Sequence, residues 1–216
     1  MQILGQSITK NSVLLALFAV TTTALISGTY LLTKDRIAVE QRRAEERALL
    51  EIIPAKRHNN SMLDHTITVD AATQGLDLRT QKQIYLATQD GKAVAAIIPV
   101  TATDGYSGDI NLIVGVNIDG SIAGVRVLGH RETPGLGDKV DLKKSDWVLG
   151  FNGRSLNNPS QAKWAVKKDK GYFDQFTGAT ITPRAVVAAT LRALQYADAN
   201  KGVLFHNEGA QQEGNN

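Results

Sequence analysis

Three threonine hydroxyls lie close together in the stretch from Asp174 to Pro183, which reads DQFTGATITP. Proline is favoured in the first turn of a helix, so Pro183 predicts that a helix begins here, with Thr182 as its N-cap. Free backbone N–H groups at a helix start attract anions, and a glycine beside them admits a bulky group. The stretch therefore predicts a phosphate site facing Thr177 and Thr180. The alternative is that these threonines only cap the helix.

The loop from His130 to Gly137, which reads HRETPGLG, is a second candidate. Its Thr-Pro-Gly core predicts a rigid turn, because proline fixes φ and glycine accepts a positive φ. The loop is either a plain connector that exposes His130 and Glu132 or part of a binding site. A metal site that adds Asp138 or His206 is a further alternative, although a His-x-Glu pair is weak evidence for zinc or iron.

Tyr106 lies in a glycine-flanked segment, Gly105-Tyr106-Ser107-Gly108, between two predicted strands. The segment is either a plain hairpin loop or an aromatic wall beside a ligand. Four other aromatic residues are expected to pack in the core and not to form a cofactor site: Trp147, Trp164, Tyr172 and Phe173.

Both stretches resemble the FMN-binding domain family, which includes the G subunit of the Rnf (Rsx) electron-transport complex and the C subunit of the Na+-translocating NADH:quinone reductase. The family's flavinylation motif, Asp-x-x-(Ser/Thr)-Gly-Ala-Thr, is matched by Asp174, Thr177, Gly178, Ala179 and Thr180. The loop from His130 to Gly137 is similar to the family's His-x-Glu-Thr-Pro-Gly-Leu-Gly. The resemblance covers roughly the whole chain, whose short length is more similar to the Rnf members.

The resemblance implies that Thr180 carries FMN through a phosphoester bond, which a separate flavin transferase makes. Asp174 would either orient or deprotonate the Thr180 hydroxyl or simply be a turn residue. The other cofactor-binding residues that the resemblance implies are Thr177, Gly178, Ala179 and Thr182 at the attachment point, and His130, Glu132, Thr133, Pro134, Gly135, Leu136 and Tyr106 against the flavin.

The function implied by the resemblance is electron relay without substrate turnover of its own. The chain would pass electrons among the membrane subunits of an Rnf-type complex that couples ferredoxin and NAD to ion movement. Two alternatives stay open: the C-type subunit of the quinone reductase, and a membrane-anchored interaction module that binds no cofactor.

Composition narrows the possible redox chemistry. The chain has no cysteine, which excludes thiolate-held iron–sulfur clusters and a catalytic thiol. Its 24 Lys and Arg are scattered among 21 Asp and Glu without a dense basic stripe, so nucleic acid is not an expected partner. A redox centre must then be a bound cofactor, and a flavin fits that requirement.

Residues 11–33 carry no charge and predict a transmembrane anchor. At 1.5 Å per residue they cover about 34 Å, against a hydrocarbon core of about 30 Å. A cleaved signal peptide is the competing interpretation. The positive-inside rule places the following domain in the cytoplasm, because Lys10 alone precedes the span and five cations follow it: Lys34, Arg36, Arg42, Arg43 and Arg47.

The resemblance implies the opposite orientation, a single-pass protein of the bacterial inner membrane whose domain faces the periplasm. Long domains translocate largely regardless of charge, so we expect the periplasmic orientation. The expected organisation is a tail and transmembrane anchor (1–33), a helical stalk (34–57), the FMN-binding domain (58–206) and a disordered tail (207–216).

The domain is predicted to be α+β. Five strand-like runs occur at 67–69, 84–88, 93–100, 110–118 and 122–128. Asp90-Gly91 and Asp119-Gly120 are hairpin signals between them, so the strands should form an antiparallel meander. We also expect a short helix at 141–149, a strand at 163–167, and a helix from Pro183 to about Asn200 that stops at Gly202.

Overall fold

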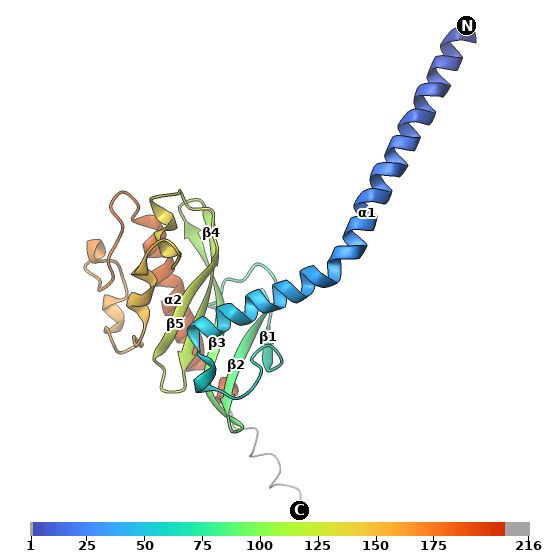
Figure 1. The fold of residues 1–216 in the computed structure, drawn as a ribbon. Helices are drawn as coiled ribbons and strands as arrows, with labels where there is room; N and C mark the ends of the chain where they lie inside the picture. The colour runs from blue at the N-terminus through green and yellow to red at the C-terminus, as the bar shows by residue number, and fades with distance from the viewer. Residues whose placement is uncertain (1, 206–216) are drawn as a thin grey trace, which may run out of the picture. The chain divides into compact units, whose positions relative to one another are not determined.

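The structure, a computed structural model, describes residues 2–205 and divides into two units, residues 1–45 and 46–216. The expected tail at 207–216 and His206 lie outside the described residues. One helix, α1 (Gln2–Ile52), makes up the described part of the N-terminal unit and runs on into the second unit (Figure 1). The stalk helix therefore continues the apolar helix without a break.

Helix α1 contains a segment, Asn11–Ile37, that is long and apolar enough to cross a membrane. Four of its threonines donate their hydroxyl groups to backbone carbonyls earlier in the helix: Thr21, Thr22, Thr29 and Thr33. Thr21 Oγ1 donates to the carbonyl of Leu17 at 2.8 Å, and Thr29 Oγ1 donates to that of Leu25 at 2.8 Å. Such bonds one turn back along the helix satisfy a hydroxyl where water is absent, so threonine is compatible with a membrane span here.

The second unit is built on a five-stranded antiparallel sheet in the order β1-β2-β3-β4-β5, as the meander prediction requires. Asp90 and Gly91 both have positive φ, 52° and 73°, which is the backbone of a tight two-residue hairpin. The strands are β1 (Thr66–Val69), β2 (Lys82–Gln89), β3 (Lys92–Gly105), β4 (Gly108–Asn117) and β5 (Ile122–Gly129). The α+β prediction is confirmed.

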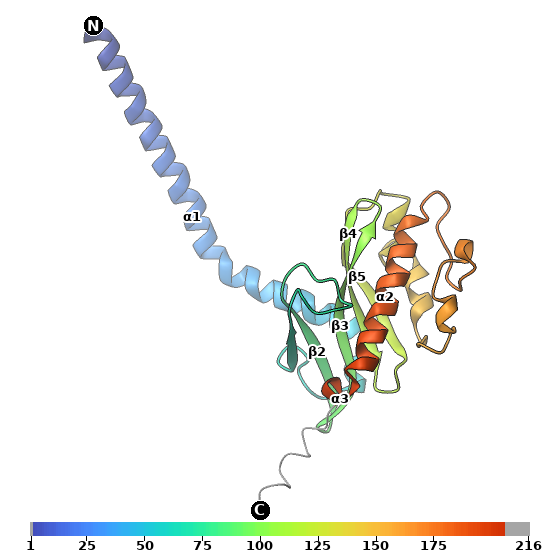
Figure 2. The ribbon, with the colours of Figure 1, turned by 180° about the vertical axis from the view of Figure 1, so that it is seen from behind.

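Both faces of this sheet are covered. Helix α2 (Ile181–Ala199) lies on one face (Figure 2), where its apolar side chains join those of β3 and β4 in the larger core. On the other face, Leu49, Ile52 and Ile53 pack with Ile97 of β3 and Ile113 of β4. The central strand β3 is therefore buried on both sides, which explains its nearly continuous apolar sequence.

Two glycines let the end of α1 approach the sheet closely. A Cβ on Gly115 would lie 2.3 Å from Cγ2 of Ile52, and a Cβ on Gly124 would lie 3.6 Å from the Ile52 Cα. An ion pair fixes the same turn, since Arg126 Nε lies 3.0 Å from Glu51 Oε2. The last turn of α1 is thus part of the domain's own core.

Residues 137–176, between β5 and α2, contain short 3-10 helices (Figure 1): η2 (Gly137–Val140), η3 (Asp146–Phe151), η4 (Gln161–Lys163) and η5 (Lys167–Asp169). The prediction of one helix over 141–149 is wrong. Residues 141–145 form a turn, and η3 begins after Ser145, whose hydroxyl oxygen accepts from the Trp147 N–H at 3.2 Å.

The predicted strand at 163–167 is also wrong. Its alternating pattern comes from Trp164 and Val166, which are buried in an aromatic cluster and not on a sheet. The Phe151 and Phe173 rings stack at 4.6 Å within this cluster. A single isolated bridge joins Val166 to Phe173, because the chain turns back tightly between them: a Cβ on Gly171 would overlap the Ala165 carbonyl. Of the predicted core aromatics, Trp164 and Phe173 are buried, whereas Tyr172 is exposed.

The remaining elements are η1 (Ala55–Arg57), directly after Pro54, and α3 (Lys201–Leu204). Helix α2 ends near the predicted residue, but Gly202 does not stop it. Asn200 interrupts the helix and its side-chain amide donates to the Tyr196 carbonyl at 2.9 Å, while Gly202 lies inside α3.

Replacing Gly115 with alanine should destabilise the domain by about 1–3 kcal/mol, because the added Cβ overlaps Ile52 although alanine has the better strand propensity. Urea unfolding of the full chain in detergent measures this cost. Gly150→Ala is the matched control, since nothing lies within 4 Å of its Cβ position. Combining Gly115→Ala with Ile52→Ala should cost less than the sum of the two single changes. Strictly additive costs would contradict this contact.

Candidate functional site

The threonine-rich stretch forms the N-terminus of α2, which begins at Ile181, two residues earlier than predicted. Thr180 occupies the N-cap position and its side chain makes no capping hydrogen bond. The prediction that Thr182 caps the helix is wrong. Its side chain is buried at 1% exposure and its hydroxyl donates to Oε2 of Glu132 instead. Pro183 still fits, because the third residue of a helix has no N–H partner to lose.

Glu132 connects three segments of the chain. Its carboxylate is buried at 4% exposure. Oε1 accepts from the backbone N–H of Ser107 at 2.8 Å, and Oε2 accepts from the hydroxyl of Thr182. We call these two hydrogen bonds the Glu132 clamp. His130 supports the clamp, since its Nδ1 accepts from the Glu132 backbone N–H at 3.1 Å.

The loop that carries Glu132 is the tight turn predicted from its proline and glycines. Gly135 has a φ of 77°, and the N–H groups of Leu136 and Gly137 both donate to the Thr133 carbonyl at 3.1 Å. Gly137 is needed for a different reason. A Cβ there would lie 2.7 Å from the Thr182 hydroxyl oxygen and 3.0 Å from Glu132 Oε2, so a larger residue would disturb the clamp.

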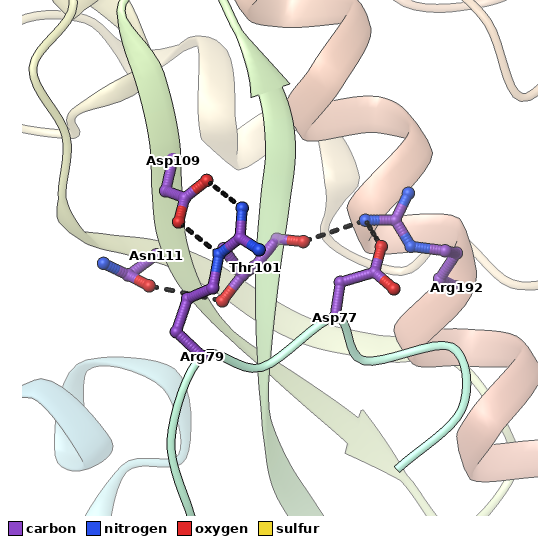
Figure 3. A network of polar contacts seen from close by, with 6 residues as sticks. All are labelled: Asp77, Arg79, Thr101, Asp109, Asn111 and Arg192. Atoms are coloured by element: carbon purple, nitrogen blue, oxygen red, sulfur yellow. Dashed lines mark hydrogen bonds and ion pairs between the residues drawn. The ribbon is translucent and has the colours of Figure 1, made fainter. Parts of the chain in front are cut away.

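A second polar network holds the hairpin that supplies Ser107 and Tyr106 (Figure 3). Arg79 donates to both oxygens of Asp109, at 2.6 and 2.8 Å, just after the hairpin loop. Hydrogen bonding from the Arg79 guanidinium is the main cause that holds the pKa of Asp109 below its ordinary value. Arg192 of α2 pairs with Asp77 at 3.1 Å and donates to the Thr101 carbonyl at 2.9 Å. The hairpin is thereby tied to the preceding loop and to α2.

These segments enclose a cavity of about 320 Å³ at the N-terminus of α2. Its size lies at the lower end of the range for small-molecule sites, about 300–1,000 Å³. A cavity of this size suits the ring system of a ligand whose other parts lie outside the cavity. The lining residues are Tyr106, Glu132, Thr133, Leu136, Gly137, Gly178, Ala179, Thr180, Ile181 and Thr182.

Most of the predicted site residues meet at this cavity. Sequence reasoning missed two of its lining residues, Gly137 and Ile181. Gly137 is the last residue of the quoted loop, and its close approach to Thr182 has no signal in the sequence. Ile181 is 44% exposed although it is apolar, and it lay outside the helix predicted to begin at Pro183.

Five predicted residues do not line the cavity: His130, Pro134, Gly135, Asp174 and Thr177. Asp174 pairs with Lys167 at 2.6 Å, and its side chain lines a different cavity. The Thr180 hydroxyl has no hydrogen-bond partner among residues 2–205. The described part of the chain therefore supplies no base for this hydroxyl.

The cavity lining contains no lysine or arginine. The positive potential available to an anion at this end of the cavity comes from the start of α2, where no described residue accepts from the N–H groups of Ile181 and Thr182. An ester oxygen on Thr180 would lie beside these donors. The residues present thus fit a cofactor that has a planar ring and one phosphate.

No group of three His, Asp or Glu side chains within residues 2–205 is arranged to hold a metal ion. Asp138 is buried and its Oδ1 has no partner in that range, but it does not join His130 and Glu132 in such a group.

Thr182→Val should cost about 1–3 kcal/mol of unfolding free energy, because it leaves the buried Oε2 of Glu132 unpaired. Thr182→Ser should restore most of the loss. Thr182→Asn distinguishes the clamp from a capping role. Asparagine is a good N-cap but does not replace the bond to Glu132, so this variant should not recover the lost stability. Chemical unfolding with exposed Thr177→Val as control measures these costs, and full rescue by asparagine would contradict the clamp.

Comparisons with known proteins match the segments that carry the candidate site. The sequence model of the FMN-binding domain matches residues 105–195, which include both motifs, and that of the RnfG N-terminal region matches residues 1–52. Among solved structures, the crystal structure of Shewanella oneidensis NqrC matches at a TM-score of 0.45 and 23% identity, over 66% of this chain and 74% of that one.

Relatives named as the G subunit of an ion-translocating oxidoreductase complex match almost the entire chain. The protein of Pseudomonas aeruginosa is 48% identical over 205 residues, 95% of each chain. That of Pseudoalteromonas atlantica is 46% identical over 200 residues, 93% of each. That of Vibrio cholerae is 45% identical over 202 residues, 94% of this chain and 95% of the relative. The chain therefore belongs to the family of G subunits of ion-translocating oxidoreductase complexes.

Proposed function

We propose that this chain relays electrons through FMN as the membrane-anchored flavoprotein subunit of an Rnf-type ion-translocating oxidoreductase complex. The observation that carries the proposal is the cavity at the N-terminus of α2, which lies within the region matched by the FMN-binding domain and has the free Thr180 hydroxyl in its lining. The other subunits of the complex would be its electron partners, and ferredoxin and NAD the couple that drives ion movement.

FMN, when bound, supplies one- and two-electron transfer, and the chain's own residues bind and orient it. Leu136, Ile181 and Tyr106 are exposed apolar side chains at the cavity and would cover the ring against water. The Glu132 clamp would fix the distance between the two walls of the cavity. Glu132 is then a positioning residue, because Ser107 and Thr182 already occupy its two oxygens.

We further propose that FMN is held covalently, by a phosphoester to Thr180. The hydroxyl would attack a flavin dinucleotide, so that an Oγ–P bond forms and a P–O bond of the phosphoanhydride breaks. A nucleoside monophosphate would leave, and the hydroxyl proton would pass to a base of a separate flavin transferase. The transferase is needed because no described residue bonds the Thr180 hydroxyl.

The domain is proposed to face the periplasm, with α1 crossing the inner membrane once. The apolar segment Asn11–Ile37 supports the anchor. Covalent attachment is consistent with this compartment, since a cofactor lost outside the cytoplasm is not easily replaced.

Thr180→Val should abolish covalent flavin and leave the domain folded, because the two side chains have nearly the same volume and the Thr180 hydroxyl makes no hydrogen bond that the change would break. Mass spectrometry of the tryptic peptide from Gly171 to Arg184, after co-expression with a flavin transferase, measures the adduct. Thr182→Ser is the control and should still be labelled. An adduct on Thr177 or Thr182, or a colourless wild-type protein, would refute the assignment.

Alkaline phosphatase fused after residue 205 should be active, because the enzyme folds only in an oxidising compartment. A fluorescent protein that matures in the cytoplasm, fused at the same position, should stay dark. The reverse pattern would show that the five cations after the span determine the topology.

A further inference from the structure

The segment between β5 and α2 carries the whole net charge of the protein. Residues 138–174, which we call the basic lobe, hold eight Lys and Arg and five Asp, a net charge of +3. The rest of the chain has sixteen residues of each sign. The lobe is therefore where the excess of positive charge is concentrated.

Two of these charges form no ion pair with any described residue. Asp169 pairs with Arg184 of α2 at 2.6 Å, and Asp174 pairs with Lys167. Among residues 2–205, no carboxylate forms an ion pair with Lys168 or Lys170, although both are exposed. Their charge is available to a partner.

The lobe also has a concave surface, a cavity of about 380 Å³ that is separate from the candidate flavin site. The Arg154 guanidinium lies 4.4 Å from the centre of the Tyr172 ring, so a cation and an exposed aromatic face form one wall. Lys167 and Asp174 also line the cavity. Arg and Tyr are residues that protein interfaces prefer.

This surface is physically continuous with the turn that carries Thr180. Trp147 lines the cavity and its Nε1 donates to the Asp174 carbonyl at 2.8 Å. The Trp147 ring packs at 5.1 Å against Phe176, whose carbonyl accepts from the Ala179 N–H at 3.2 Å. A protein bound to the lobe would lie beside the attachment turn.

We infer that the basic lobe is the docking surface for an acidic face of the flavin-transferring enzyme. The inference rests on the proposed attachment of flavin to Thr180 by such an enzyme. An enzyme that must reach Thr180, react and leave needs fast and reversible association, which opposite charges provide. A permanent subunit interface would be more apolar. An anionic membrane is a poorer fit, because a bilayer is flat and this surface is concave.

The test is the rate of flavin attachment to the full-length protein in neutral detergent, with a flavin transferase and its flavin dinucleotide. Lys168→Glu combined with Lys170→Glu should lower kcat/KM about tenfold or more at low salt, through KM and with little change in kcat. Salt should slow the wild type toward the variant rate. Lys82→Glu with Lys92→Glu is the matched control, since it makes the same change in net charge on strands outside the lobe.

The possible outcomes separate the two proposals. If the wild type is labelled normally and the lobe variant has the same kcat/KM as the wild type, the docking proposal is overturned and the attachment proposal stands. An equal loss in the control variant would also overturn it, because net charge would then be the cause. A loss seen only with anionic phosphatidylglycerol vesicles, and not in detergent, would assign the lobe to lipid. Absence of flavin on wild-type Thr180 would overturn the attachment and this inference with it.

Discussion

The candidate site depends on one buried carboxylate. A buried carboxylate is costly unless hydrogen bonds satisfy it, and Glu132 finds its two partners at Ser107 and Thr182, on segments far apart in the sequence. The same two bonds bring together the β3–β4 hairpin, the loop before η2 and the start of α2, which are three sides of the cavity. The free-energy cost of burying the Glu132 carboxylate is therefore offset only when these three segments are correctly assembled. The site and the local fold thus form together. Gly137 is part of this constraint, because a side chain there would occupy the space of the clamp.

The prediction of the sheet from sequence succeeded where the signals are local. Alternating apolar residues and the Asp90-Gly91 turn determine strands and hairpins over a few residues, and the five strands lie where the pattern indicates. The start of α2 was misplaced because Thr182 and Pro183 form a good local capping sequence, whereas the clamp to Glu132 acts across 50 positions. The strand expected at 163–167 failed for a similar reason. Trp164 and Val166 are buried in a cluster with Phe151 and Phe173. Their alternation in the sequence looks the same as that of a strand buried on a sheet, so no local pattern separates the two cases.

The candidate site was predictable in residue type but not in geometry. Two motifs identified most of the cavity lining, yet Asp174 lies in the motif and not at the cavity, and its carboxylate pairs with Lys167 instead. The sequence could not identify Ile181 as a lining residue, since its exposure depends on the hairpin and loop that leave this side of α2 open. A motif thus states which residue types are needed, and the packing of distant segments decides which of them touch the ligand.

The charge distribution of the site bears on why a covalent bond would suit it. The cavity contains a buried carboxylate and no lysine or arginine, and the N–H groups of Ile181 and Thr182 supply the positive potential at the end beside Thr180. A free phosphate monoester carries a charge of about −1.5 to −2 at neutral pH, which two backbone donors beside a carboxylate would hold weakly. Esterification to Thr180 leaves a single negative charge and removes the need for affinity altogether. The cations that the chain does concentrate lie in the basic lobe, outside the cavity, where they are free to attract a protein and do not bind the cofactor.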